Sequence, residues 1–277
     1  MIDRSRFALN RILCPSLPLA QFFELAGEVG VGGVELRNDL PGVGVIDGLE
    51  SAAVRDMADR SSLDILTINA LQQFNLEAVL PERKRELAGL AELAERLGCR
   101  AIVLVPNNDS RDKRTPSQIF RETVGALKSF APFLADRGLL GYAEPLGFGE
   151  CSLRSKVTAL EAIGESGASC YRIVHDTFHH TIGPDTLATL QKNIDVKTIG
   201  LVHLSGVTSP LPLSRCRDEH RVLVTPDDRM ESVRQVRILE SRGYRGSLSF
   251  EPFAPEVQRR APSELKKALA ESMGLFA

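Results

Sequence analysis

Long apolar runs are absent from this sequence of 277 residues. No stretch reaches the roughly 18 apolar residues that a transmembrane helix needs. The first residues, MIDRSRFALNRIL, carry charges where a signal peptide would need its apolar stretch. The five cysteines stand singly, without a C-x-x-C pair, which is typical of reduced thiols in a cytosolic protein. We therefore expect a soluble, cytoplasmic protein with no membrane partner.

An excess of positive charge is missing as well. Lys and Arg number 34 and Asp and Glu number 36, so the formal net charge is −2. No overall basic field therefore favours nucleic acid or an anionic membrane as a partner. The sequence has neither a G-x-x-x-x-G-K-[ST] loop nor a Gly-rich dinucleotide fingerprint. We expect no nucleic-acid partner and no nucleotide cofactor.

What the sequence does contain is a repeat of short apolar runs, each followed by a helical pattern. Such continuously apolar runs suit strands buried on both faces of a parallel sheet. Eight strand–helix units average roughly 35 residues each, which predicts an α/β fold, a single (β/α)₈ TIM-barrel domain over residues 1–277. A doubly wound open sheet would show a Gly-rich turn after the first strand, and FALNRILCP has none. The predicted strands are 6–10, 33–37, 64–70, 101–106, 139–144, 171–176, 199–205 and 246–251.

Helix boundaries are predicted from caps and periodicity. Thr115, Pro116 and Gln118 have the pattern of an N-cap, a first-turn proline and a capping box. An apolar stripe over 87–97 predicts an amphipathic helix that Gly98 can end. The predicted helices are 19–29, 49–60, a helix that includes 87–97, 115–136, 153–166, 184–193, 229–242 and 262–275.

Four of the predicted strands end on a residue that can bind a metal ion. The strands read LLGYAEP, YRIVHD, IGLVHLSG and GSLSFEP, and their polar tips are Glu144, Asp176, His203 and Glu251. Because the carboxyl ends of the strands meet on one rim of a closed barrel, we expect these side chains to converge on one point. Two Glu, one Asp and one His suit one divalent cation such as Mn²⁺, Mg²⁺, Co²⁺ or Zn²⁺.

Each of the four residues also has an ordinary structural interpretation. Glu144 or Glu251 can form a salt bridge or a cap at a strand end. Asp176 can cap the following turn, and His203 can be a hydrogen-bonded histidine of the core. Their joint occurrence favours the metal site, because a buried cluster of carboxylates without a cation would be strongly self-repelling.

The sequence resembles the xylose-isomerase-like TIM-barrel superfamily, which includes sugar isomerases and epimerases, inosose dehydratases and endonuclease IV. The resemblance covers the whole chain, is closest to the inositol-catabolism branch, and is carried by NR near the first strand, VELRND, LTINA, AEPLGF, HDTFHH and GLVHLSGV. It implies a divalent metal held by the four tip residues, and a substrate contact from His179, the histidine of the D-x-x-H motif. In the ketose epimerases of the superfamily the two metal-binding glutamates are also acid and base, a role that the resemblance carries to Glu144 and Glu251.

Further polar residues near the strand ends are candidate sugar contacts, because hydroxyl-rich substrates need paired donors and acceptors. They are Glu35, Arg37, Asn69, Asn107, His179, His180 and Arg221. The long loop 206–228 adds Asp218 and His220, which together with His179 resemble the ligands of a further zinc in the endonuclease IV branch. The alternative is that His179 contacts substrate while the Asp-Glu-His run is solvated.

The predicted chemistry is proton transfer next to a carbonyl group. A metal that chelates a carbonyl oxygen and the neighbouring hydroxyl acidifies the C–H between them and stabilises the enediolate. Return of the proton on the opposite face gives epimerisation, return to the neighbouring carbon gives isomerisation, and loss of a β-hydroxyl gives dehydration. We expect a metal-dependent isomerase or epimerase that acts on a small polyol ketone, such as an inosose or a ketose. An inosose-type dehydratase is the alternative on the same site.

Two other classes of protein stay open. An endonuclease IV-like phosphodiesterase would carry additional histidines after the third and fourth strands, where this chain has Asn69 and Asn107–Asn108. The slightly acidic charge balance also argues against it. A non-catalytic sugar-binding protein is less attractive because both glutamates are retained at the metal. The sequence leaves the particular sugar, the metal and a homo-oligomer open.

Overall fold

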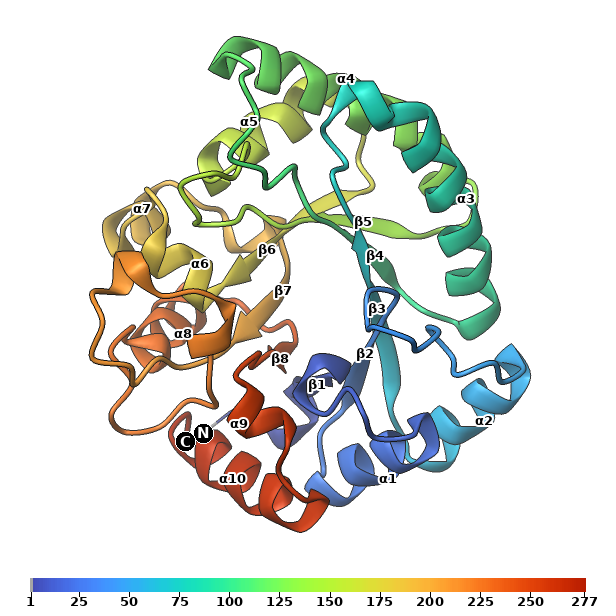
Figure 1. Ribbon diagram of the computed structural model, residues 1–277, viewed down its shortest axis with the longest axis vertical. Helices are drawn as coiled ribbons and strands as arrows, with labels where there is room; N and C mark the ends of the chain where they lie inside the picture. Colours follow the sequence, from blue (N-terminus) through green and yellow to red (C-terminus); the bar gives the residue numbers. More distant parts are fainter. Residues whose placement is uncertain (1) are drawn as a thin grey trace.

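Eight parallel strands form a closed barrel at the centre of the protein (Figure 1). The computed structural model describes residues 2–277. Each strand pairs with the next in the chain, and the last returns to the first with Phe7 opposite Leu248. The predicted TIM barrel is confirmed. The strands are β1 (Phe7–Asn10), β2 (Gly33–Arg37), β3 (Asp64–Leu71), β4 (Ala101–Leu104), β5 (Leu140–Ala143), β6 (Tyr171–Asp176), β7 (Ile199–Leu204) and β8 (Leu248–Phe250).

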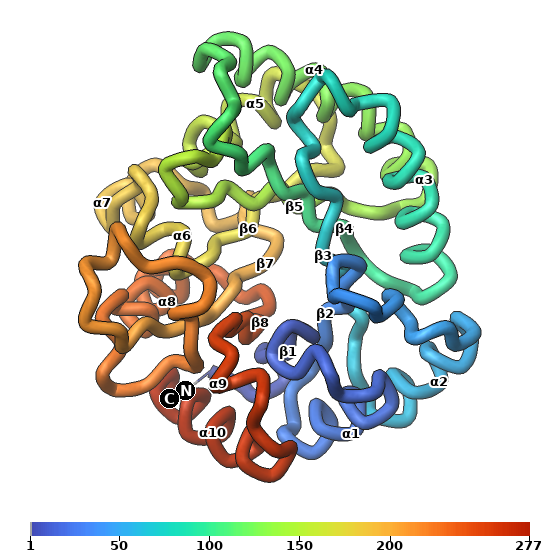
Figure 2. Tube along the Cα trace, viewed as in Figure 1, coloured from blue at the N-terminus to red at the C-terminus, as the bar shows by residue number. Residues whose placement is uncertain are grey.

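Helices surround the barrel as an outer ring, and the chain passes once around it from the N-terminus to the C-terminus (Figures 1 and 2). The two ends meet beside α10, where the backbone N–H of Ile2 donates to the carbonyl oxygen of Phe276 at 3.4 Å. No helix within residues 2–277 is both long enough and apolar enough to cross a membrane. The helices are α1 (Leu19–Val29), α2 (Ser51–Arg60), α3 (Leu80–Leu97), α4 (Pro116–Ala135), α5 (Lys156–Ser166), α6 (Thr177–Ile182), α7 (Leu187–Lys192), α8 (Ser232–Ser241), α9 (Pro255–Gln258) and α10 (Pro262–Gly274).

The caps that the sequence predicts are present in the structure. The Thr115 side chain accepts from the backbone N–H of Gln118, and the Gln118 side chain accepts from the backbone N–H of Thr115, so a complete capping box opens α4. Gly98 ends α3 in the left-handed region at a φ of 66°, which a residue without a Cβ adopts at little cost. The apolar stripe of α3 is buried against the barrel as its spacing predicts.

The segment after β6 differs from the prediction of one helix over 184–193. A short helix, α6, begins directly after Asp176, and α7 follows only at Leu187. The Asp176 carboxylate causes this early start, because its Oδ1 accepts the backbone N–H of His179 at 2.7 Å and caps the new helix. The D-x-x-H motif is therefore the first turn of a helix, and His179 and His180 both lie on it.

Part of the barrel interior below its carboxyl-end rim is apolar. Side chains two residues apart on a strand share a face, so Val174 and Leu201 lie beneath Asp176 and His203 on the inner side of the barrel. Both are buried in one cluster with Ala8, Val103, Tyr142 and other small or apolar side chains. This packed floor leaves the rim as the place where polar inward-facing residues gather.

Candidate metal centre

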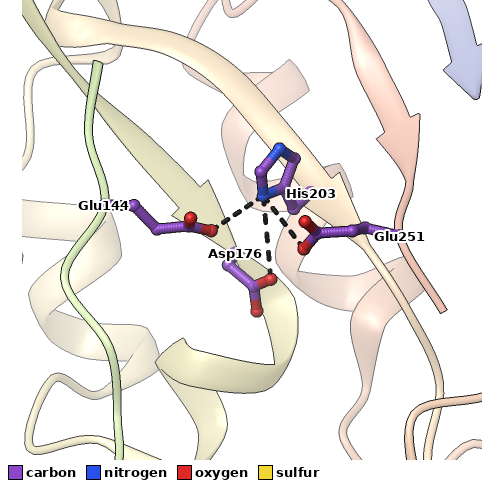
Figure 3. Close-up of side chains that lie close together, drawn as sticks. All are labelled: Glu144, Asp176, His203 and Glu251. Carbon is purple, nitrogen blue, oxygen red and sulfur yellow. Dashed lines mark hydrogen bonds and ion pairs between the residues drawn. The ribbon is translucent and has the colours of Figure 1, made fainter. Parts of the chain in front are cut away.

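Four side chains from neighbouring strands converge at the carboxyl end of the barrel (Figure 3). Glu144 directly follows β5, Asp176 is the last residue of β6, His203 lies in β7 and Glu251 directly follows β8. Each offers one ligand atom, and these atoms all lie within 4.8 Å of one another. The convergence that the strand ends predict is therefore present.

The His203 ring stands at the centre of this group. Its Nδ1 lies 2.7 Å from Oε1 of Glu144 and 3.2 Å from Oε2 of Glu251. Oδ2 of Asp176 is 4.0 Å from the same nitrogen. Figure 3 shows Glu144 and Glu251 approaching from opposite sides, with Asp176 between them. One ring nitrogen thus faces three carboxylates.

Burial makes the charges of this group depend on one another. Glu144, Asp176, His203 and Glu251 are at most 4% exposed. Burial raises the pKa of Glu144 to about 7, with His203 opposing the shift. Burial also opposes the charge on His203, yet Glu251 and the other carboxylates hold the pKa of this imidazole well above its ordinary value. Three buried carboxylates therefore need positive charge at their centre, which a proton on His203 supplies and which a divalent cation would supply more fully.

Two arginines complete the electrostatics around the cluster. Nη2 of Arg221 donates to Oδ2 of Asp176 at 2.6 Å and to Oε2 of Glu251 at 2.8 Å. Nη1 of Arg37 donates to Oε1 of Glu251 at 2.9 Å. The Phe253 ring lies against both guanidinium groups, 4.6 Å from that of Arg221 and 5.3 Å from that of Arg37. Burial opposes ionisation of Glu251, but His203, Arg221 and Arg37 together hold its pKa well below the usual range.

A cavity of about 190 Å³ opens above the cluster. This volume lies below the roughly 300–1,000 Å³ of drug-sized sites, so the cavity suits a small ligand. Of the predicted sugar contacts, Arg37, Asn69, His179 and Arg221 line it, together with Glu144 and Glu251. A larger cavity of about 480 Å³ lies between the loop after β7 and α10 and is lined by none of these residues.

Three of the predicted sugar contacts lie outside the lining of this cavity. Glu35 is 0% exposed, and its carboxylate is directed into the barrel toward Thr67 and His203. The Asn107 amide is held in its own loop, where Nδ2 donates to Asp112 at 2.8 Å. His180 packs against His175, with 5.1 Å between the ring centroids.

The residues predicted for a second cation do not form a ligand group. Within residues 2–277, the four-residue cluster is the one set of three or more His, Cys, Asp and Glu side chains whose ligand atoms gather closely. His220 turns its Nδ1 toward the backbone N–H of Arg217, at 3.0 Å. Asp218 accepts from Nη1 of Arg221 at 3.2 Å. His179 and Asp218 line the cavity, but His220 does not.

No site role was predicted for Asn10 or Phe253, although NR at residues 10–11 carried part of the family resemblance. Asn10 ends β1, and its Nδ2 lies 3.2 Å from both Oε1 of Glu35 and Oε1 of Glu251. A polar residue at the end of the first strand was a usable signal, because the same rule identified the four tips. Phe253 carried no signal, since it contacts Arg37 of β2 and Arg221 of the loop after β7, both far away in the sequence.

A closed (β/α)₈ barrel with four converging ligand side chains at its carboxyl-end rim defines a TIM-barrel protein with a candidate metal centre. The family model described as xylose isomerase-like TIM barrel matches residues 23–276, and the chain belongs to this family.

Comparisons with individual proteins agree with this assignment. The inosose isomerase of Halalkalibacterium halodurans is 29% identical over 211 residues, which are 75% of this chain and 73% of that protein. A xylose isomerase domain containing protein from Salmonella typhimurium LT2 has a TM-score of 0.92 at 36% identity, covering 100% of this chain and 98% of that one. The structure of the IolI protein with a bound zinc atom has a TM-score of 0.87 at 21% identity, covering 98% of each chain. At that identity the likeness to IolI is one of fold.

Proposed function

We propose that this protein is a divalent-metal-dependent isomerase or epimerase that acts on a small polyol ketone, an inosose or a ketose, by proton transfer through an enediolate. The observation that carries the proposal is the placement of two glutamates on opposite sides of one histidine nitrogen. Glu144 and Glu251 lie 2.7 and 3.2 Å from Nδ1 of His203 and both line the same small cavity (Figure 3). The 29% identity to an inosose isomerase supports the substrate class.

The donor set fits a divalent cation held by Glu144, Asp176, His203 and Glu251. Carboxylate and imidazole ligands together suit Mn²⁺, Mg²⁺, Co²⁺ or Zn²⁺. When bound, such a cation supplies a Lewis acid that acidifies the C–H beside a carbonyl group. The crystal structure of the IolI protein holds a zinc atom, which supports the presence of a cation in this fold.

The proton transfers fall to the two glutamates. Oε1 of Glu144 contacts His203, while Oε2 accepts no hydrogen bond from any residue in the range 2–277, so it is available to take a proton from a substrate carbon. Both oxygens of Glu251 accept hydrogen bonds from arginine. Glu251 is thus the weaker base of the two and lies on the other side, where it would return a proton to the substrate carbon after taking one from solvent.

Four polar residues of the cavity wall are proposed to bind the substrate hydroxyls: Arg37, Asn69, His179 and Arg221. Burial lowers the pKa of His179 to about 4, so its ring enters the cavity neutral. A neutral imidazole suits uncharged hydroxyl groups, because it does not require an anionic partner.

The remaining proposals concern the domain organisation, the partners and the cellular compartment of the enzyme. We propose one barrel domain over residues 1–277 that works without a nucleotide cofactor, a nucleic-acid partner or a membrane partner. All five cysteines are buried and free, which supports a reducing compartment such as the cytoplasm. Association into a homo-oligomer stays open.

Turnover in D₂O tests the proposal. Protein stripped with a chelator is reloaded with Mn²⁺, Mg²⁺, Co²⁺ or Zn²⁺ and incubated with inososes and ketoses. We expect metal-dependent product that carries deuterium at the carbon next to the carbonyl group. Product without deuterium would contradict exchange through the two glutamates, and a product that has lost water would identify the dehydratase. Absence of turnover with every metal and substrate would refute the proposed function.

A further inference from the structure

Glu35 is a buried carboxylate that the proposed reaction does not use. It lies on β2, is 0% exposed and does not line the cavity. A buried carboxylate is costly unless hydrogen bonds satisfy it. Its Oε2 accepts from Oγ1 of Thr67 at 2.6 Å and from Nδ2 of Asn69 at 2.8 Å. Its Oε1 accepts from Nδ2 of Asn10 at 3.2 Å. Residues of β1 and β3 therefore fix this carboxylate in one place.

The same carboxylate reaches the candidate metal ligand on β7. Oε2 of Glu35 lies 3.2 Å from Nε2 of His203. The other ring nitrogen, Nδ1, faces the three carboxylates of the cluster. In Figure 3 the two nitrogens lie on opposite sides of the ring, and the dashed contacts leave from one of them alone. Glu35 thus contacts the Nε2 edge of the His203 ring, which is turned away from the cluster.

We propose that Glu35 is a positioning residue that accepts the Nε2–H of His203 and so presents the Nδ1 lone pair of that ring to the cation. A neutral imidazole carries its proton on one nitrogen, and the hydrogen bond made by one nitrogen decides which one is free to bind metal. Partners of this kind also fix the orientation of a ligand histidine and raise its basicity. The inference rests on the proposed metal site but not on the reaction.

Asn10 extends this role to a second ligand. Its Nδ2 lies 3.2 Å from Oε1 of Glu35 and 3.2 Å from Oε1 of Glu251. One amide therefore joins the residue behind His203 to a carboxylate of the cluster. A shift of the Glu35 side chain would disturb His203 directly and Glu251 through Asn10.

Two substitutions separate the effect of the negative charge of Glu35 from the effect of its side-chain length. Glu35→Gln keeps the length and an acceptor oxygen but removes the charge, whereas Glu35→Asp keeps the charge and withdraws it by one methylene. The control is Glu240→Gln, because Glu240 is paired with Arg6 at 2.8 Å. Arg6 directly precedes β1, at the end of the barrel opposite the cluster.

The first measurement is zinc affinity by calorimetry, with circular dichroism to verify folding. We expect both Glu35 variants to bind zinc about 10- to 100-fold more weakly, the usual cost of losing such a partner, and Glu240→Gln to bind as the parent does. The second measurement follows the His203 Nε2 proton in the zinc-loaded protein by ¹H–¹⁵N spectroscopy, which is practical with five histidines. In the parent this proton should exchange slowly, and in both variants faster.

The outcomes distinguish this inference from the proposed function. Weaker zinc binding with faster Nε2 exchange supports the positioning role, even if the parent protein turns over no inosose or ketose. Unchanged zinc affinity in a folded Glu35 variant overturns the role and leaves the proposed function standing. Coordination of zinc through Nε2, or no zinc binding by the parent, also overturns it. If Glu35→Gln fails to fold, Glu35→Asp decides in the same way.

Discussion

Arg37 donates from Nη1 to Oε1 of Glu251 at 2.9 Å, and Arg37 is itself held by Asp39 through two hydrogen bonds of 2.7 Å. These hydrogen bonds hold Oε1 of Glu251 in place. Within residues 2–277, Glu144 has no arginine contact, and its carboxylate contacts the ring of His203 instead. The two glutamates that the mechanism treats as an acid–base pair therefore sit in unequal surroundings.

The first prediction follows from this inequality. Glu144→Gln should lower turnover by at least about 10²-fold, the scale of lost acid–base catalysis, while the melting temperature and KM change little. Glu251→Gln should lower turnover by a similar factor but also destabilise the fold, because two buried guanidinium groups each lose one of their charged partners. Steady-state kinetics and thermal unfolding on the same preparations test this. Full activity in both variants would mean that the glutamates are only ligands.

The second prediction concerns Arg221, the buried arginine beside the cluster. Arg221 is 1% exposed and bridges Asp176 and Glu251. Arg221→Met should lower the free energy of unfolding, measured by urea titration in the presence of a chelator, by about 3–5 kcal/mol, since it removes the guanidinium that two buried carboxylates share.

A surface ion pair supplies the control for Arg221. Arg234 and Glu231 also lie 2.8 Å apart, but their side chains are 60% and 55% exposed. In a urea titration, Arg234→Met should lower the free energy of unfolding by no more than about 1 kcal/mol. Equal losses in the two variants would show that burial of the pair is not the deciding factor.

The third prediction links metal to stability. Zinc at about 100 times its dissociation constant should add about 2.7 kcal/mol to the free energy of unfolding. His203→Ala should abolish this increment and lower zinc occupancy together. His220→Ala should keep both the stability increment and the zinc occupancy, because His220 lies outside the four-residue group. Thermal unfolding with and without zinc or EDTA measures the increment, and a parent protein whose melting temperature ignores zinc would refute the site.

The fourth prediction is a pH dependence that originates away from the cluster. Burial lowers the pKa of His180 to about 3, and nearby Lys156 acts in the same direction. An unfolded histidine titrates near 6.5. Between these values the unfolded chain binds a proton that the folded protein does not, so stability falls as the pH drops below about 6.5.

His180→Phe tests this dependence because it removes the titrating group and keeps a ring. Between pH 6.5 and 4.5 the variant should lose about 2–3 kcal/mol less than the parent, at about 1.4 kcal/mol for each pH unit. Urea unfolding at several pH values measures both curves. If the free energy of unfolding falls equally with pH in both proteins, His180 binds its proton as readily in the folded protein as in the unfolded chain.

The fifth prediction tests a cap that was predicted from the sequence. Thr115→Ala removes the side chain that accepts the N–H of Gln118 and should cost about 1 kcal/mol. Thr115→Ser keeps the hydroxyl and should cost much less. A urea midpoint that is the same for alanine and serine would mean that the capping box does not stabilise α4.

The sequence predicted the barrel and the four converging side chains because both depend on local patterns. Apolar runs identify buried strands, and β2 and β6 begin and end at the predicted residues. Closure of a parallel barrel then places every strand end on one rim. Asp176 had two interpretations, ligand or cap, and the structure shows that its two oxygens face different partners: Oδ1 caps α6 and Oδ2 faces His203.

The partners of those side chains were beyond the reach of sequence patterns. Glu35 was predicted to face the cavity, but its orientation depends on donors from β1 and β3 and on His203, which is 168 residues away. The helix α6 was missed because six residues are too few to show a period, and its start depends on the Asp176 side chain. Contacts between distant strands leave no trace in local spacing.

Pairing of β8 with β1 has a consequence for protein synthesis. Glu251 follows the last strand, whereas Asn10, which contacts it, ends the first. On the ribosome Asn10 emerges before every member of the cluster and Glu251 emerges after the other three, so a nascent chain carries three members before the fourth. At the proposed metal site, high-affinity capture of a cation would therefore wait until β8 has joined the sheet, and metal content would become a measure of completed folding.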